Sequence, residues 1–271
     1  MAPTEAARSQ YEERFPGNTS TLKDTDPELV DYFGNFAFDE VLRHSRLDAP
    51  TRLMVQLAAM IACQAVQEYR VMLGVALRVG VTPVQVKELV YQAVPYVGMA
   101  KVFDFLHATN EVLTEHGIAL PLPGQSATTP ETRLEEGLRV QKAVIGADRV
   151  EGLYAAAAAD ELHIQGFLSD NCFGDTYTRT GVDLRTRELL TFAMLVSLGG
   201  CDPQVKGHIA ANVRVGNDRE RLIDVVTQLL PYIGYPRTLN ALADINEITD
   251  PPAKPSQTGG HRGDGGSAGV A

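Results

Sequence analysis

Two long stretches of apolar residues stand out in the sequence, one in each half of the chain. They read LMVQLAAMIACQAV from Leu53 and ELLTFAMLVSLGG from Glu188. Both are longer than an ordinary strand and rich in Ala, Leu and Met, which favour helices. We therefore expect each stretch to form a buried central helix.

Start and stop signals for helices recur along the chain. An oxygen-bearing side chain precedes a proline, as at a helix N-cap, in the dipeptides Asp26-Pro27, Thr82-Pro83 and Asp202-Pro203. Glycines that allow a left-handed helix end follow the periodic segments at Gly80, Gly98, Gly216 and Gly234. Because the alternating patterns typical of strands are nearly absent, the sequence predicts an all-α fold.

The second half of the chain repeats the first. A shift of 135 residues aligns Phe38, Asp48, Thr51 and Arg52 with Phe173, Asp183, Thr186 and Arg187. After a one-residue step, VYQAVPYVG from Val90 matches VTQLLPYIG from Val226. The period is too long for a solenoid repeat, so it indicates a duplicated module.

The repeat and the local composition divide the chain into five segments. Two helical modules cover residues 21–117 and 136–249, and a linker over residues 118–135 joins them. Residues 1–20 are predicted to form a flexible N-terminus. Residues 250–271, rich in Pro, Gly and Ser, are predicted to form a disordered tail.

Charge and composition narrow the range of partners. The net charge is −10 and no dense block of Lys and Arg occurs, which argues against binding to nucleic acid or an anionic membrane. The N-terminus lacks the apolar core of a signal peptide. The sequence also contains no run of roughly 18 apolar residues, which is the length that a membrane-spanning helix needs. Three cysteines are too few for a disulfide framework. We therefore expect a cytoplasmic protein that binds a small-molecule substrate.

The duplication allows an internal comparison of the two modules. Positions needed for folding should persist in both copies, whereas positions needed for chemistry can survive in only one. Glu188 stands where the first module has Leu53, and His208 stands where it has Met72. A carboxylate in an apolar helix costs several kcal/mol unless it is paired, and a histidine partner would make a proton shuttle. Alternatively, both side chains face solvent near a helix end.

These residues are part of a longer pattern. It reads Leu184-x-x-Arg187-Glu188-Leu189-Leu190, then His208, Gly216 and Gln228-x-x-Pro231-Tyr232-x-Gly234-x-Pro236. The pattern resembles that of the carboxymuconolactone decarboxylase family, which includes the alkylhydroperoxidase D-type proteins. The resemblance implies that Glu188 and His208 act together in a site of the second module, without a cofactor. The corresponding site of the first module is then degenerate.

The resemblance also implies an architecture and an assembly. The two modules should pack with pseudo-twofold symmetry, as single-module members of the family do in their dimers. Such members tend to form hexamers as trimers of dimers. The two-module chain is therefore expected to be a homo-oligomer, either a homotrimer that reproduces the hexamer or a homodimer, and a monomer is left open.

The cysteines bear on a different chemistry of the same family. Its peroxidase branch carries Cys-x-x-Cys followed by a histidine four residues later, whereas this chain reads Cys201-Asp-Pro-Gln204 before His208. Without the second thiol the usual dithiol relay is lacking. Cys172 could form a redox pair with Cys201 if their Cα atoms lie within about 7 Å. Otherwise both, like Cys63, are small buried apolar residues.

Further polar residues of the second module are candidates for substrate binding, namely Asp175, Tyr177, Tyr232 and Arg237. Spacings typical of a metal site, such as HExxH, are missing, and no metal is expected.

Three functions stay open at the level of the sequence. The first is a cofactor-independent acid/base enzyme that uses His208 and Glu188 for decarboxylation or proton transfer on a small carboxylated or lactone-like substrate. The second is an antioxidant peroxidase that uses Cys201 with or without Cys172. The third is a non-catalytic ligand-binding or scaffold protein.

Overall fold

The computed structural model describes residues 2–16 and 22–251, which form helices and connecting loops without any β-strand. The predicted all-α class is confirmed for this part of the chain. Residues 252–271, most of the predicted disordered tail, lie outside the described residues.

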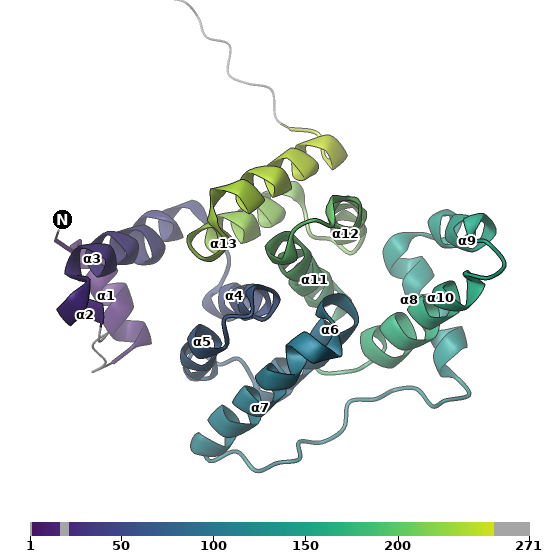
Figure 1. Cartoon of the computed structure of the whole chain (residues 1–271), viewed down its shortest axis with the longest axis horizontal. Helices are drawn as coiled ribbons and strands as arrows, with labels where there is room; N and C mark the ends of the chain where they lie inside the picture. Colours follow the sequence, from purple (N-terminus) through teal and green to yellow (C-terminus); the bar gives the residue numbers. More distant parts are fainter. Residues whose placement is uncertain (1, 17–21, 252–271) are drawn as a thin grey trace, which may run out of the picture.

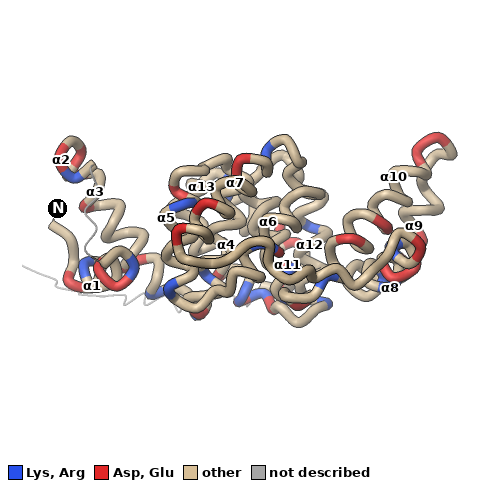
Figure 2. The backbone as a smooth tube through the Cα atoms, turned by 90° about the horizontal axis from the view of Figure 1, so that it is seen from below, with Lys and Arg blue, Asp and Glu red and all other residues tan. Residues whose placement is uncertain are grey.

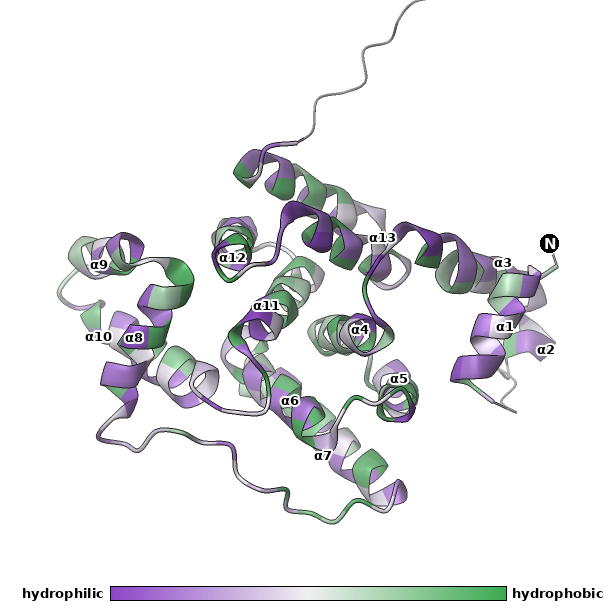
Figure 3. Ribbon diagram, turned by 180° about the vertical axis from the view of Figure 1, so that it is seen from behind, coloured by the Kyte–Doolittle hydropathy of each residue, from purple (hydrophilic) through white to green (hydrophobic). Residues whose placement is uncertain are grey.

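Two buried helices form the centre of the molecule. Helix α4 (Ala49–Cys63) and helix α11 (Leu184–Leu198) pack against each other, and the other helices surround them (Figure 1). Asp48 and Asp183 cap their N-termini by accepting hydrogen bonds from the backbone N–H groups three residues later. Hydrophobic positions run along both helices, whereas α1 to α3 carry many hydrophilic ones (Figure 3). The predicted buried central helices are thus confirmed.

Each module adds further helices, one of which packs across the boundary between the modules. Module 1 continues with α5 (Val66–Arg78), α6 (Pro83–Val97) and α7 (Met99–Glu115), and module 2 with α12 (Asp202–Arg214) and α13 (Arg219–Ile248). Helix α6 of module 1 lies against α11 of module 2, and α13 of module 2 lies against α4 of module 1. Because the contacts are reciprocal, the two modules share one apolar core.

Glycines at matching positions shape the last helices of each module. Gly98 separates α6 from α7 with a φ of 90°, and Gly234 bends α13 with a φ of 77°. Backbone with positive φ is readily adopted only by glycine. Helix α13 is therefore the counterpart of α6 and α7 together, which agrees with the tandem modules predicted from the repeat.

A wing of short helices extends from each end of the molecule (Figures 1 and 2). The N-terminal wing comprises α1 (Glu5–Arg14), α2 (Leu22–Thr25), α3 (Pro27–Asn35), the π-helix η1 (Phe36–Glu40) and the 3-10 helix η2 (Leu42–His44). The other wing comprises α8 (Arg133–Ile145), α9 (Ala147–Ala156), α10 (Leu162–Phe167) and the π-helix η3 (Leu168–Tyr177).

The described part of the N-terminal segment, residues 2–16, contains helix α1 in place of the flexible chain expected over residues 1–20, whereas residues 1 and 17–20 lie outside the described residues. Tyr11 of α1 and the C-cap residue Phe15 lie one helical turn apart, and their rings lie 5.8 and 6.0 Å from the ring of Phe38. Phe15 is buried in this contact. An apolar pair at this spacing gives a helix one face to pack, so the segment is held against η1.

The helix-start signals were correct at two of the three prolines. Thr82 forms the capping box with Gln85, and Asp26 takes the N-cap position of α3, although its side chain makes no capping hydrogen bond. The prediction for Asp202 is wrong because Cys201 is the N-cap of α12 and Asp202 is already the first helical residue. An acidic residue there still favours the positive end of the helix dipole.

The linker between the modules follows the surface and is fixed to module 2. The backbone N–H of Thr180 donates to the carbonyl of Gln125 over 3.0 Å. The hydroxyl of Thr128 donates to the carbonyl of Gly174, also over 3.0 Å. No helix in the described part of the chain is both long and apolar enough to cross a membrane. The cytoplasmic location stays a prediction.

Candidate active site

Glu188 lies in α11 and is completely buried, with an exposed fraction of 0%. Both of its carboxylate oxygens are occupied. The phenol of Tyr177 donates to Oε1 over 2.8 Å, and His208 Nδ1 lies 2.8 Å from Oε2. These contacts satisfy a charged group inside an apolar helix, as burial of a carboxylate requires. The side chain of Glu188 therefore points into the protein and not toward solvent.

His208 lies on α12 and joins this helix to α11. Its side chain is 12% exposed, so the imidazole sits at the edge of the buried region. Asn212, one turn later, donates from Nδ2 to the backbone carbonyls of Glu188 and His208 over 3.0 and 2.7 Å. Asn212 thus fixes the spacing of the two helices that carry the pair.

The orientation of the imidazole is set from two sides. With Glu188 as the acceptor, Nδ1 carries the hydrogen, and Nε2 is left as the atom that can gain or lose a proton. Among the described residues, none forms a hydrogen bond with His208 Nε2. The ring of Tyr96 meets the imidazole edge to face, with 5.6 Å between the centroids.

Tyr96 belongs to module 1, so the site is composite. It comes from α6, and its hydroxyl donates to the hydroxyl of Tyr177 over 2.9 Å. Tyr177 comes from η3 of module 2 and passes its own hydrogen to Glu188. The two phenols and the carboxylate therefore form a chain that crosses from one module to the other.

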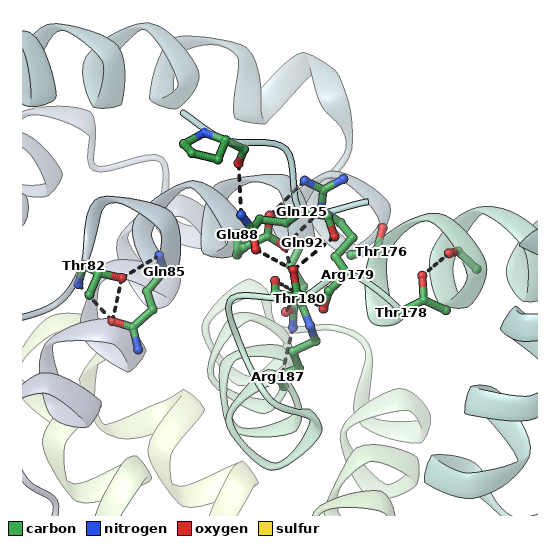
Figure 4. Close-up of polar contacts among 12 residues, drawn as sticks. Thr82, Gln85, Glu88, Gln92, Gln125, Thr176, Thr178, Arg179, Thr180 and Arg187 are labelled. Atoms are coloured by element: carbon green, nitrogen blue, oxygen red, sulfur yellow. Dashed lines mark hydrogen bonds and ion pairs between the residues drawn. The ribbon is translucent and has the colours of Figure 1, made fainter. Parts of the chain in front are cut away.

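A second arm of hydrogen bonds leads from Tyr177 into the core. Thr191 Oγ1 lies 2.7 Å from the Tyr177 hydroxyl and accepts a hydrogen bond from Gln92 Nε2 over 2.9 Å. Gln92 in turn accepts from Arg187 Nη1 over 3.0 Å, a contact in the region that Figure 4 draws. Gln92 Nε2 also donates to the backbone carbonyl of Arg187 over 2.8 Å, so this arm ties Tyr177 of η3 and Gln92 of α6 to helix α11.

Burial keeps the two phenols protonated. It raises the pKa of Tyr96 and of Tyr177 well above the ordinary value, and the nearby Glu188 adds to the effect in both cases. A neutral phenol can donate to Glu188, whereas a phenolate would repel it. The phenols therefore act as hydrogen-bond donors.

Arg187 is held by an ion pair that crosses between the modules. Its guanidinium is 0% exposed and donates from Nη2 to Glu88 on α6 over 2.8 Å (Figure 4). Glu88 also pairs with Arg179, over 2.9 Å. This ion pair forms the inner end of the arm that leads to Glu188.

Module 1 has an apolar version of the same arrangement. Leu53 and Met72 occupy the positions of Glu188 and His208, and both are buried. Tyr232, the repeat of Tyr96, lies near Phe33, with 6.4 Å between the ring centroids. Tyr96 of module 1 thus contacts module 2, and Tyr232 of module 2 contacts module 1. The site of module 1 lacks both the carboxylate and the imidazole.

The cysteines do not form a pair. All three are free, and Cys172 and Cys201 contact different groups. Cys172 Sγ lies 3.7 Å from the Tyr96 hydroxyl, whereas Cys201 Sγ lies 3.3 Å from the carbonyl of Leu195. Burial raises the pKa of Cys172 to about 12, and burial together with Asp202 raises the pKa of Cys201.

Of the four residues predicted to bind substrate, the structure brings only Tyr177 into contact with Glu188. Asp175 pairs with Arg133 over 2.7 Å on the wing. Arg237 on α13 is exposed and lies 3.6 Å from the sulfur of Cys63. Tyr232 lies on the module 1 side. Within the described residues, no group of three or more His, Cys, Asp and Glu side chains is placed to hold a metal ion.

Sequence reasoning missed four residues of the network, namely Gln92, Tyr96, Thr191 and Asn212. For two of them, Tyr96 and Gln92, the sequence contained a signal that could have been used. The repeat pairs Tyr96 with Tyr232 and Gln92 with Gln228. A residue kept in both modules looked structural, although each copy faces a different site. Thr191 and Asn212 have no such partner and carried no signal.

Comparison with known proteins shows the family to which the chain belongs. The sequence profile of the Carboxymuconolactone decarboxylase family matches residues 27–111 and again residues 164–246. The two matches cover more than half of the chain. The protein therefore belongs to the carboxymuconolactone decarboxylase family, as a member with two modules.

Two individual proteins illustrate the degree of similarity. The chain is 27% identical to the 4-carboxymuconolactone decarboxylase of Acinetobacter baylyi over 118 residues, which are 44% of this chain and 87% of the relative. A solved structure from Burkholderia xenovorans, described as a proposed gamma-carboxymuconolactone decarboxylase subunit, is 22% identical with a TM-score of 0.48. It covers 89% of this chain and 96% of its own.

Proposed function

We propose that the protein is a cofactor-independent lyase that decarboxylates a small lactone or related carboxylic acid, with His208 as the general acid and base. The observation that carries the proposal is the 2.8 Å contact between His208 Nδ1 and a Glu188 carboxylate whose other oxygen is already satisfied. The decarboxylase activity named for the Acinetobacter relative supports this class of reaction.

The chemistry needs one proton at a defined position. Loss of carbon dioxide breaks a carbon–carbon bond and leaves its electron pair in a conjugated enolate. Imidazolium Nε2 of His208 then gives its proton to the carbon, which forms the new C–H bond and leaves the imidazole neutral. Glu188 stabilises the cationic ring before the transfer and keeps Nε2 directed away from α11. Water then supplies the proton that restores the imidazolium.

Thiol chemistry receives less support from the site. The nucleophile in peroxide reduction is a thiolate, and burial raises the pKa of both Cys172 and Cys201. The cysteine beside Glu188 is moreover Cys172, whereas the family pattern pointed to Cys201.

The decisive experiment measures carbon dioxide release from 4-carboxymuconolactone by the wild-type chain and by His208→Gln. We expect the variant to keep its fold and to lose at least roughly a hundredfold in kcat. His116→Gln is the matched control, because His116 also lies at a helix, as the C-cap of α7, and its Nδ1 donates to the backbone carbonyl of Val112 instead of to a carboxylate. Full turnover by His208→Gln would end the proposal. Absence of turnover in the wild type on lactone and open-chain acids alike would favour a binding or scaffold role.

The state of assembly belongs to the same proposal. A homotrimer or a homodimer is expected from the family resemblance, and light scattering on the purified chain distinguishes these from a monomer.

A further inference from the structure

A cleft lies between α6 and the linker, and neither Glu188 nor His208 lines it. Its volume is about 390 Å³, which is in the range of small-molecule sites. One wall is formed by α6 and the other by linker residues 120–125. Figure 4 shows Gln125 of the linker close to Glu88 and Arg179.

The cleft combines apolar walls with two cations. Val84, Leu120 and Leu122 contribute apolar surface, and Lys87 and Arg179 contribute positive charge. The ring of Tyr91 lies between the two, with its centroid 5.8 Å from Lys87 Nζ and 5.2 Å from the Arg179 guanidinium carbon. An apolar surface with a few convergent charged groups is typical of a site for a small organic ion.

Positive charge exceeds negative charge at this place. Glu88 is the single carboxylate among the described lining residues, and it is shared by Arg179 and Arg187. Lys87 donates to the neutral amide of Asn110 and pairs with no carboxylate among the described residues. Burial lowers the pKa of Lys87. An uncompensated cation in a half-buried cleft is notable in a chain whose net charge is −10.

The linker that joins the two modules forms one wall of this cleft. Gln125 is fixed by hydrogen bonds with Thr180, one of them the 3.0 Å contact between backbone atoms. Thr180 follows Arg179, so the same contacts that anchor the linker also place the guanidinium at the cleft. The position of the linker wall and the position of Arg179 are therefore fixed by the same hydrogen bonds.

We propose that this cleft is a second ligand site, which binds a small organic carboxylate. The carboxylate would lie between Lys87 and Arg179, and its apolar body would lie against Val84 and the leucines of the linker. A bound carboxylate would supply the counter-charge that Lys87 lacks. This site is separate from the Glu188–His208 pair and does not rest on the proposed decarboxylation.

The test uses benzoate as the probe and isothermal titration calorimetry on the full chain. We expect Lys87→Gln to weaken benzoate binding roughly tenfold or more, because a charge-assisted contact is lost. Lys101→Gln is the control, since Lys101 is an exposed lysine of α7 outside the cleft and changes the net charge equally. Benzyl alcohol, with the same ring and no charge, should bind far more weakly than benzoate.

A second variant keeps the test decisive if Lys87→Gln fails to fold. Leu120 is 36% exposed on the linker, so Leu120→Asp should fold normally and still weaken benzoate binding by adding negative charge to the wall. His208→Gln should bind benzoate as the wild type does. The proposal is overturned if wild type shows no binding at millimolar benzoate, if Lys87→Gln binds unchanged, or if His208→Gln abolishes binding and so places benzoate at the other site.

Discussion

Tyr96 of module 1 donates its hydroxyl hydrogen to Tyr177 of module 2 over 2.9 Å, and Tyr177 donates to Glu188. The contact joins residues 81 positions apart in sequence and makes the site of one module dependent on the other. A two-module chain therefore holds in one polypeptide a site that neither module completes alone.

Removal of the Tyr96 hydroxyl should weaken the site without unfolding the protein. In Tyr96→Phe the Tyr177 phenol loses one donor, and we expect a loss of about 1 kcal/mol in the free energy of unfolding. If the proposed function holds, kcat should fall roughly tenfold, the effect typical of lost outer hydrogen bonds at a site. Tyr232→Phe is the matched control at the repeated position. Equal effects of the two variants on kcat would contradict the composite site.

Glu188→Leu should separate stability from activity. Module 1 already packs Leu53 at the equivalent position with an exposed fraction of 1%, so the helix accepts leucine there. We expect the variant to fold with a loss of about 1–3 kcal/mol in the free energy of unfolding, because the Tyr177 hydroxyl and the His208 imidazole lose the acceptor to which they donate. Carbon dioxide release should be lost.

Thermal unfolding and the activity assay on the same preparation check this prediction. The companion variant Glu188→Leu with His208→Met reproduces both residues of module 1 and removes the histidine left without its partner. A large loss of stability in this double variant would show that the polar pair is needed for folding.

Glu88→Gln should be strongly destabilising. Arg187 and Glu88 have side-chain exposed fractions of 0% and 2%, so the change leaves a buried guanidinium without its counter-charge. Breaking such a pair costs about 3–5 kcal/mol. The control is Asp224→Asn at the repeated position, where the partner Arg46 is 70% exposed and lies 3.7 Å away. Urea denaturation should show a much smaller loss for this control, about 1 kcal/mol or less.

Alkylation of Cys172 should be slow in the folded protein and strongly dependent on pH. Because burial raises its pKa to about 12, only about 1 in 10,000 molecules carries the thiolate at pH 8. Folding raises the pKa above the ordinary 9.0, so the stability from this group is fully present below pH 9 and is lost as the pH rises through about 12.

Iodoacetamide labelling followed by peptide mass spectrometry measures the rate at each cysteine. Cys201 and Cys63 are partly exposed and should react before Cys172, and all three should react alike in urea. Labelling of Cys172 as fast as Cys201 in the folded chain would contradict the burial argument.

Much of the fold could be predicted from the sequence because its signals are local. The apolar stretches at Leu53 and Glu188, the capping box at Thr82 and the glycines at Gly98 and Gly234 depend on the chemistry of a few neighbouring residues. The helix at Glu5–Arg14 was missed because its packing partner, Phe38, lies in another segment.

The sequence also determined the two central residues of the candidate site. Glu188 and His208 stand where the first module has Leu53 and Met72, and this difference within one chain marks the two positions. A carboxylate in an apolar helix needs a partner, and this requirement together with the family resemblance pointed to His208.

Only the tertiary structure decided what surrounds this pair. It placed Tyr96 from the other module and Cys172 at the site, and it placed Tyr232, Arg237 and Cys201 elsewhere. The reason is geometric. Crossed packing of α6 on α11 and of α13 on α4 brings each module's tyrosine to the opposite module, and distances between helices remote in sequence depend on how their side chains pack.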